Sequence, residues 1–283
     1  MFANGWFSLR NVPRTLDTTD VPVISEGGRA MSEPTSRFWQ LFLELFESLP
    51  RQGPGNRACV ERALGLCDGL PPFPKVADLG CGVGGQTLHL AEMTRGTIVA
   101  VDLHEPSISR LRETVLSLGL SERIFPMVAD MADTGLPRES FDLVWSEGAL
   151  YSIGMEQALS VCRGLLRPGG FLAFTDAVWL RDDPPAEVRE SFELDYPSMG
   201  RTADILVLLE KSGFSPAGHF SLPDEAWWTD FYTPMEKRIC EMRKQYEGDE
   251  DALAVLDRLA LEPEMRRKYP EYFAYEFFTA RRT

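Results

Sequence analysis

The spacing of apolar residues changes character along the chain. Over residues 35–49 apolar side chains recur at helical spacing and Pro50 ends the run, which predicts an amphipathic helix. A second helix is expected around residues 57–67, before a turn. From Lys75 onward, short apolar or β-branched runs alternate with helical windows. This alternation is typical of a parallel sheet with helices on both faces.

Seven strands are expected in an α/β, doubly wound, Rossmann-like sheet, with a helix over residues 203–212 before the sixth strand. The predicted strands cover residues 76–79, 97–103, 123–128, 141–146, 170–178, 214–222 and 272–280. A charged helical block over about residues 224–268 is predicted as an insertion between the last two strands. Residues 1–30 are expected to be a flexible arm, 31–70 a helical cap, and 71–283 the α/β domain.

The composition of the chain argues against several classes of partner and ligand. The net charge of −14 repels phosphate backbones and anionic headgroups, so we expect neither a nucleic-acid nor a membrane partner. Five cysteines without CxxC pairing favour a reducing, cytoplasmic location. The apolar runs are shorter than the roughly 20 residues of a spanning helix, and the first 30 residues show no secretory signal. The three histidines have no metal-binding spacing, so no metal site is predicted.

A glycine-rich turn follows the first predicted strand. Gly80, Gly82 and Gly85 satisfy the GxGxxG dinucleotide pattern, and Asp102 lies where that fold places a ribose-binding acid. A second acid, Asp78, precedes the turn by two residues, at a place suited to a cationic amino-acid group. Acids at successive strand ends favour a positively charged nucleoside ligand over a pyrophosphate.

The acids after the second and third strands suit a nucleoside. The Asp102 carboxylate can accept both ribose hydroxyls, while Leu103 can cover an adenine face. The Asp130 carboxylate can accept the exocyclic amine, and the backbone N–H of Met131 can meet a ring nitrogen.

Taken together, these motifs resemble those of class I S-adenosylmethionine-dependent methyltransferases. The likeness runs over roughly residues 75–178 and includes the glycine motif, both nucleoside acids, the strand at 141–144 and the turn at 166–170. Residues 146–151 and 227–232 also resemble a subgroup of small-molecule methyltransferases with no assigned substrate. The implied cofactor residues are Asp78, Gly80, Cys81, Gly82, Gly84, Asp102, Leu103, Asp130, Met131, Ser146 and Gln52.

The resemblance implies a seven-stranded sheet with an antiparallel last strand. It also implies transfer of a methyl group from S-adenosylmethionine to a small O, N or C nucleophile by in-line displacement, with S-adenosylhomocysteine as product. Glu147 and Tyr151 follow the fourth strand and are candidates to orient or deprotonate the nucleophile; the alternative is that they cap and pack a helix. Trp228 and Tyr232 are candidate substrate contacts, or core residues at helical spacing.

Two other functions stay open on the sequence. A nicotinamide-dependent oxidoreductase shares the glycine pattern, but no second phosphate turn follows. A non-catalytic protein that binds S-adenosylmethionine would need the same acids. The turn that contains Gln52 could close over the methionine end of the cofactor or simply join two helices. The inserted helices could serve as a lid or as a homodimer contact.

Overall fold

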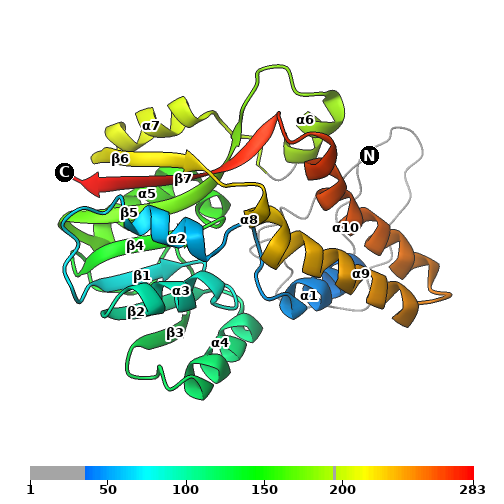
Figure 1. Ribbon diagram of the computed structural model, residues 1–283, viewed down its shortest axis with the longest axis horizontal. Helices are drawn as coiled ribbons and strands as arrows, with labels where there is room; N and C mark the ends of the chain where they lie inside the picture. The colour runs from blue at the N-terminus through cyan, green and yellow to red at the C-terminus, as the bar shows by residue number, and fades with distance from the viewer. Residues whose placement is uncertain (1–35, 194–195) are drawn as a thin grey trace.

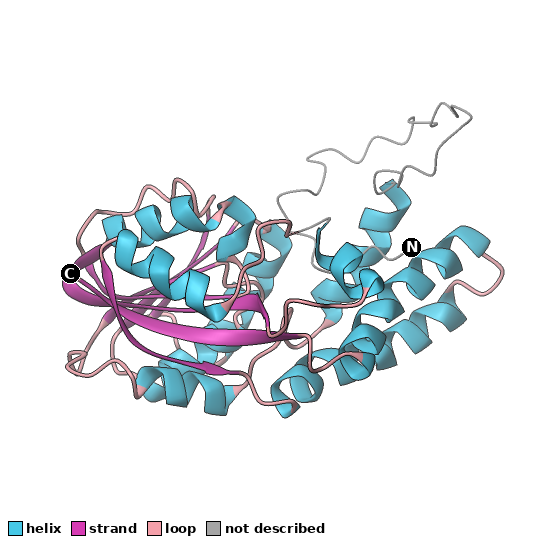
Figure 2. Ribbon diagram, turned by 90° about the horizontal axis from the view of Figure 1, so that it is seen from above, coloured by secondary structure: helices cyan, strands magenta, loops and turns pink. Residues whose placement is uncertain are grey.

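The computed structural model of the protein describes residues 36–193 and 196–283. The arm predicted over residues 1–30 lies outside the described residues. The described chain forms a sheet flanked by helices and, at one end of that sheet, a lobe of helices (Figures 1 and 2). The strands that point toward the lobe place their carboxyl ends there, which is where open α/β sheets bind ligands.

The sheet has the order β3-β2-β1-β4-β5-β7-β6. Its strands are β1 (Lys75–Leu79), β2 (Thr97–Asp102), β3 (Ile124–Val128), β4 (Phe141–Glu147), β5 (Leu166–Trp179), β6 (Phe214–Ser221) and β7 (Phe273–Arg282). Successive neighbours from β3 to β5 are parallel, whereas β7 runs antiparallel to both β5 and β6. The predicted seven-stranded sheet with an antiparallel last strand is therefore confirmed.

Strand register brings the predicted nucleoside acids to one edge of the sheet. Leu79 at the end of β1 pairs with Val101, and Asp102 at the end of β2 pairs with Val128 at the end of β3. The four residues after Lys75 in β1 are all buried, as expected for a central parallel strand covered on both faces. The polar residues that follow these strands therefore emerge side by side.

Helices cover the two faces in separate groups. One face packs against α2 (Arg57–Leu64), α3 (Gly85–Met93) and α4 (Glu105–Ser117), and the other against α5 (Met155–Leu165) and α7 (Thr202–Lys211). A short helix, η2 (Leu150–Ile153), follows β4. Two details differ from the sequence prediction. Turns connect β3 to β4 where a helix was expected, and an unpredicted helix, α6 (Ala186–Glu193), follows β5.

The lobe combines the first described helix with the predicted insertion. It contains α1 (Ser36–Ser48), α8 (Glu225–Trp227), the π-helix η3 (Trp228–Tyr232), α9 (Thr233–Gln245) and α10 (Glu250–Lys268). The Glu44 carboxylate ties α1 to α9 because it accepts hydrogen bonds from Arg238 (3.0 Å) and from the Tyr246 hydroxyl (2.7 Å). The predicted cap over residues 31–70 is therefore divided: α1 packs in the lobe, while α2 packs on α3 and β7.

Leu41 tests how strongly α1 is anchored in the lobe. Its side chain is fully buried in the core, whereas Gln40 beside it is exposed. We expect Leu41→Ala to lower the free energy of unfolding by about 2–5 kcal/mol, since it removes buried methyl groups and leaves a cavity. Gln40→Ala should change it by less than about 0.5 kcal/mol. Urea unfolding of both variants provides the measurement, and equal small effects would show that α1 is not part of the cooperative core.

Candidate active site

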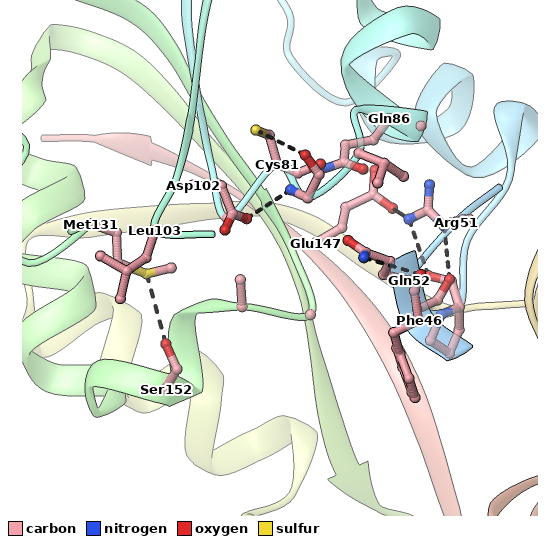
Figure 3. Close-up of a pocket in the computed structure, with 18 of the residues that line it drawn as sticks. Phe46, Arg51, Gln52, Cys81, Gln86, Asp102, Leu103, Met131, Glu147 and Ser152 are labelled. Atoms are coloured by element: carbon pink, nitrogen blue, oxygen red, sulfur yellow. Dashed lines mark hydrogen bonds and ion pairs between the residues drawn. The ribbon is translucent and has the colours of Figure 1, made fainter. Parts of the chain in front are cut away.

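A pocket is lined by residues from the carboxyl edge of the sheet and from the helical lobe (Figure 3). Its wall comes from α1, the turn at residues 51–54, the glycine loop, the ends of β2 and β4, and single residues of η3, α10 and β7. Segments distant in sequence therefore meet at this pocket. The sheet side of the pocket is lined mainly by backbone atoms and carboxylates, and the lobe side is lined mainly by aromatic rings.

The glycine loop leaves β1 and turns sharply under the pocket. The backbone N–H of Gly80 donates to the carbonyl of Val101 at 2.8 Å, which anchors the loop to β2. Gly82 adopts φ +53°, and a Cβ atom there would stand 2.4 Å from the side-chain oxygen of Gln52. A larger residue at position 82 would therefore strain the backbone and displace Gln52 from the pocket wall.

Asp102 is braced by the loop that it faces (Figure 3). One carboxylate oxygen accepts the backbone N–H of Gly82 at 2.8 Å, and the other accepts the backbone N–H of His104 at 2.9 Å. Burial raises the pKa of Asp102, while these two backbone donors oppose that rise. Each oxygen keeps a second lone pair, so the fixed carboxylate can still accept two neighbouring hydroxyls from a ligand.

Residues beside Asp102 add apolar side chains to the pocket wall. Leu103 is 37% exposed and lines the pocket, as do Met131 and Asp130. One oxygen of the Asp130 carboxylate accepts the backbone N–H of Ala132 at 2.8 Å. The structure therefore brings the predicted nucleoside residues into one pocket, with apolar side chains placed to cover a flat ring.

A buried ion pair occupies the opposite part of the pocket. The guanidinium of Arg51 donates to a Glu147 oxygen and to the carbonyls of Gly53 (2.9 Å) and Pro54 (3.2 Å). The other Glu147 oxygen accepts the indole N–H of Trp145 at 2.8 Å. Both side chains are nearly inaccessible to solvent. The pair joins the turn after α1 to the end of β4.

One guanidinium nitrogen of Arg51 does not take part in these hydrogen bonds. Its Nη1 atom is buried and has no hydrogen-bond partner among the residues that the structure describes. Buried guanidinium nitrogens are normally satisfied, so this atom indicates a place for a ligand acceptor. It lies near the start of α3, because a Cβ atom on Gly85 would stand 3.8 Å from it. A helix N-terminus and a guanidinium together suit a carboxylate.

Some of the predicted cofactor residues lie behind the residues that line the pocket and hold them in place. Asp78 is fully buried, accepts hydrogen bonds from Thr87 and Gln86, and has its pKa raised to about 7 by burial. The Ser146 hydroxyl donates to the carbonyl of Leu79 at 2.7 Å. Gly84 begins α3, and a side chain there would strike Leu111. In this structure Asp78 ties α3 to β1 and does not face the pocket.

The structure does not bring the substrate residues predicted in the insertion into the pocket wall. The Trp228 ring lies under the guanidinium of Arg267, and the Tyr232 hydroxyl donates to Glu262 at 3.0 Å. The pocket wall as described includes neither ring and takes Phe231 instead. The reason is the π-helix η3, whose wider turn directs successive side chains differently from the expected α-helical spacing.

The two predicted catalytic residues both line the pocket. Glu147 already accepts hydrogen bonds from Arg51 and Trp145, so the structure gives it a positioning contact with Arg51. The Tyr151 ring lies 5.1 Å from that of Tyr196, whose hydroxyl donates to Asp176 at 2.7 Å. Their catalytic roles stay predictions.

Sequence reasoning missed several pocket residues. They share large or charged side chains that come from α1, the following turn, α10 and β7: Phe42, Phe46, Arg51, Glu262 and Tyr275. The sequence could have indicated Arg51, because it precedes Gln52 in the turn that is predicted as a possible cover for the ligand. It could not have indicated Glu262, since only the packing of α10 against the end of the sheet brings that residue to the pocket.

Comparisons with known proteins agree with this geometry. Residues 76–170 match a family model described as a methyltransferase domain. Methyltransferase GfsG of Streptomyces halstedii is 33% identical over 121 residues, which are 42% of this chain and 44% of that relative. Dimethylglycine N-methyltransferase of Parasynechococcus marenigrum is 33% identical over 118 residues, or 41% and 42% of the two chains. The matches thus span less than half the length of either relative.

A solved structure extends the likeness beyond the matched segment. An S-adenosylmethionine-dependent methyltransferase from Geobacter sulfurreducens, solved with S-adenosylhomocysteine, superposes with a TM-score of 0.73 at 17% identity. The superposition covers 85% of this chain and 97% of that one. The chain therefore shares the fold of that methyltransferase, residues 76–170 match the methyltransferase-domain family model, and the resemblance noted from the sequence is confirmed.

The described helices also bear on membrane association. In residues 36–193 and 196–283, every helix is too short or too polar to cross a bilayer.

The raised pKa of Asp176, which accepts a hydrogen bond from the neighbour of Tyr151, can be tested through protein stability. Its carboxyl is fully buried, and burial raises its pKa from 3.8 to about 7. Between pH 4 and 7 the unfolded chain loses this proton while the folded chain keeps it, so this group makes stability fall as pH rises. Asp176→Asn should remove that loss, because asparagine can still hydrogen-bond to Tyr196 and to the backbone.

The measurement is the free energy of unfolding of both proteins at several pH values. The stability of Asp176→Asn relative to the unchanged protein should increase from pH 4 to pH 7 and stay level above about pH 7. A difference that is constant across this range would show that Asp176 ionises normally in the folded protein.

Proposed function

We propose that this protein is an S-adenosylmethionine-dependent methyltransferase that acts on a small-molecule acceptor. The observation that carries the proposal is the pairing, in one pocket, of a braced carboxylate for ribose with a buried guanidinium for a carboxylate. A nucleoside that carries an amino-acid chain has both complementary groups. The match to a methyltransferase domain family supports the same conclusion.

The residues present fit the cofactor. Asp102 would hold the ribose hydroxyls, and Leu103, Asp130 and Met131 would surround the adenine. Arg51, with the start of α3, would hold the amino-acid carboxylate. When bound, S-adenosylmethionine supplies an electrophilic methyl carbon on a sulfonium. The chain's own contribution is to fix both ends of the cofactor and thereby aim its centre at the lobe.

The lobe side of the pocket would receive the acceptor. The Phe42, Phe46 and Phe231 side chains there are buried, so an acceptor bound beside them would contact apolar rings and lose part of its contact with water. A pocket of this kind suits a small molecule better than a polymer. Tyr151 stands at the sheet side and is proposed to orient the nucleophile. Glu147 is proposed to act through Arg51 by holding its guanidinium in place.

The oxidoreductase alternative fits the fold less well. In this sheet β7 is inserted antiparallel between β5 and β6, so the second half does not repeat the parallel mononucleotide-binding unit. A protein that binds S-adenosylmethionine without turnover would use the same residues. Acceptor-dependent release of S-adenosylhomocysteine separates it from an enzyme. One relative is named for methylating dimethylglycine, which supports a small acceptor.

The ribose assignment predicts a loss of affinity. Asp102→Ala should weaken binding of S-adenosylhomocysteine by about 10- to 100-fold, because charge-assisted hydrogen bonds to the ribose are lost. Calorimetric titration measures the change. Asp133→Ala, an exposed acid in the loop after β3, is the matched control and should bind normally. Unchanged affinity in Asp102→Ala would remove the ribose role from Asp102.

The carboxylate assignment predicts a selective loss. The double variant Arg51→Gln with Glu147→Gln removes both members of the ion pair, so no single charge is left buried. It should bind S-adenosylhomocysteine at least about tenfold more weakly. Its affinity for 5′-methylthioadenosine, which has no amino-acid chain, should change by less than about twofold. Equal losses for both ligands would mean that the pair shapes the whole pocket and does not bind the carboxylate.

A further inference from the structure

We propose that His104 and Arg110, which lie on the ribose side of the site, are positioning residues for the amino-acid end of the cofactor. This inference rests on the proposed function and adds to it two side chains outside the pocket wall as described. Both contact the carboxyl end of α1, directly before the turn that carries Arg51. They act through that turn and not by touching the ligand.

His104 links the ribose acid to α1. Its backbone N–H donates to the Asp102 carboxylate at 2.9 Å, and its side-chain Nε2 atom donates to the Glu47 carboxylate at 2.7 Å. The imidazole is only 14% exposed, so this contact is partly shielded from water. One residue therefore joins the acid proposed to bind the ribose to the last turn of α1.

Arg110 holds the end of α1 from the neighbouring helix α4. Its Nη1 atom donates to the backbone carbonyl of Glu47 and, at 3.2 Å, to that of Leu49. The last carbonyls of a helix have no partner inside that helix, and a cation near them is also favoured by the helix dipole. The guanidinium therefore fixes the direction in which the chain leaves α1 before Pro50.

The turn that follows α1 packs on the glycine loop and on the start of α3. A Cβ atom on Gly85 would stand 3.6 Å from the carbonyl oxygen of Pro50 and 3.7 Å from the side chain of Arg51. The side chain of Gln52 lies against Gly82 of the glycine loop. Because the turn packs this closely, a shift of the end of α1 moves Arg51 relative to α3.

Glu147 fixes only one end of the Arg51 side chain. It binds the guanidinium, whereas the backbone of Arg51 belongs to the turn held by His104 and Arg110. The Nη1 atom of Arg51 keeps one position near the start of α3 only when both ends are held. Accurate placement matters because a charge-assisted hydrogen bond needs a donor–acceptor distance of about 2.7–2.9 Å.

The same geometry separates the two ends of the cofactor. Asp102 is braced by the backbone N–H groups of Gly82 and His104, so replacing the His104 side chain leaves that brace in place. Figure 3 shows Asp102 and Arg51 on different sides of the pocket. Loss of the side-chain contacts to α1 should therefore affect the amino-acid end of the cofactor and spare the nucleoside end.

A double variant tests the proposal with two ligands. His104→Ala with Arg110→Ala, called the α1-contact variant, removes both side-chain contacts to the end of α1. It should bind S-adenosylhomocysteine at least about fivefold more weakly, because Arg51 no longer meets the carboxylate in the right place. Its affinity for 5′-methylthioadenosine, which lacks the amino-acid chain, should change by less than about twofold. Calorimetric titration of the full chain measures both affinities.

The matched control lies at neighbouring positions of α4. Glu105→Ala with Arg112→Ala removes an ion pair of 3.1 Å between two exposed side chains. This control variant should bind both ligands within about twofold of the unchanged protein. Thermal unfolding midpoints of all three proteins check that α1 and the lobe remain folded.

A second comparison shows whether the effect passes through Arg51. When Arg51 and Glu147 are both replaced by Gln, the amino-acid end of the site has already lost its cation. Adding the substitutions of the α1-contact variant should then weaken S-adenosylhomocysteine binding by less than about twofold further, because both sets of residues act on the same contact. A further loss of about fivefold would show that they act independently and would overturn the proposal.

The outcomes separate this inference from the proposed function. Equal losses for both ligands in the α1-contact variant, unchanged affinity for S-adenosylhomocysteine, or the same selective loss in the control variant would overturn the positioning role of His104 and Arg110. Failure of the unchanged protein to bind S-adenosylhomocysteine would instead refute the proposed function and, with it, the inference that rests on it.

Discussion

The ion pair between Arg51 and Glu147 connects the parts of this molecule that make the site. Arg51 belongs to the turn after α1, and Glu147 ends β4 at the carboxyl edge of the sheet. The same turn is held to the lobe, because the Gly55 backbone N–H donates to the carbonyl of Ala226 at 2.8 Å. Breaking one member of a buried pair typically costs about 3–5 kcal/mol, so the sheet and lobe are held in one arrangement.

This arrangement divides the pocket by chemistry. The sheet offers the rigid features that parallel strands provide at their ends: a glycine loop, a braced carboxylate in Asp102, and the start of α3. The lobe offers rings and a single buried carboxyl, Glu262, carried on helices that the sheet does not require. The residues proposed to contact the nucleoside and those proposed to contact the acceptor thus come from different parts of the chain.

The residues on the sheet side of the pocket could be predicted from the sequence, because the patterns that indicate them lie within short segments of the chain. Alternating apolar runs indicate strands, and an acid directly after such a run must emerge at the carboxyl edge, as Asp102 does. The lobe side depends on tertiary packing. Trp228 and Tyr232 have the spacing of a helix face, but η3 is a π-helix and turns Phe231 inward instead. The sequence gives no local signal for Glu262, since its place in the pocket wall depends on the contact with Tyr232 and on how α10 packs.

Asp78 shows a further limit of sequence reasoning. A carboxylate near a glycine turn can face a ligand or bind the backbone of its own fold, and only the packing decides between these roles. Here Thr87 and Gln86 donate hydrogen bonds to Asp78, whereas the Nη1 atom of Arg51, in the turn after α1, is buried beside the pocket without a hydrogen-bond partner among the described residues. The charged group proposed to bind the ligand therefore comes from the turn after α1, which carries no recognisable motif.

We propose that the pocket binds S-adenosylmethionine and not a dinucleotide. The first experiment is therefore parallel calorimetric titration of the full chain with S-adenosylmethionine, S-adenosylhomocysteine and NADH. We expect one site per chain for the first two ligands and no measurable heat of binding for NADH. Binding of NADH with no binding of S-adenosylhomocysteine would contradict it and would restore the oxidoreductase interpretation.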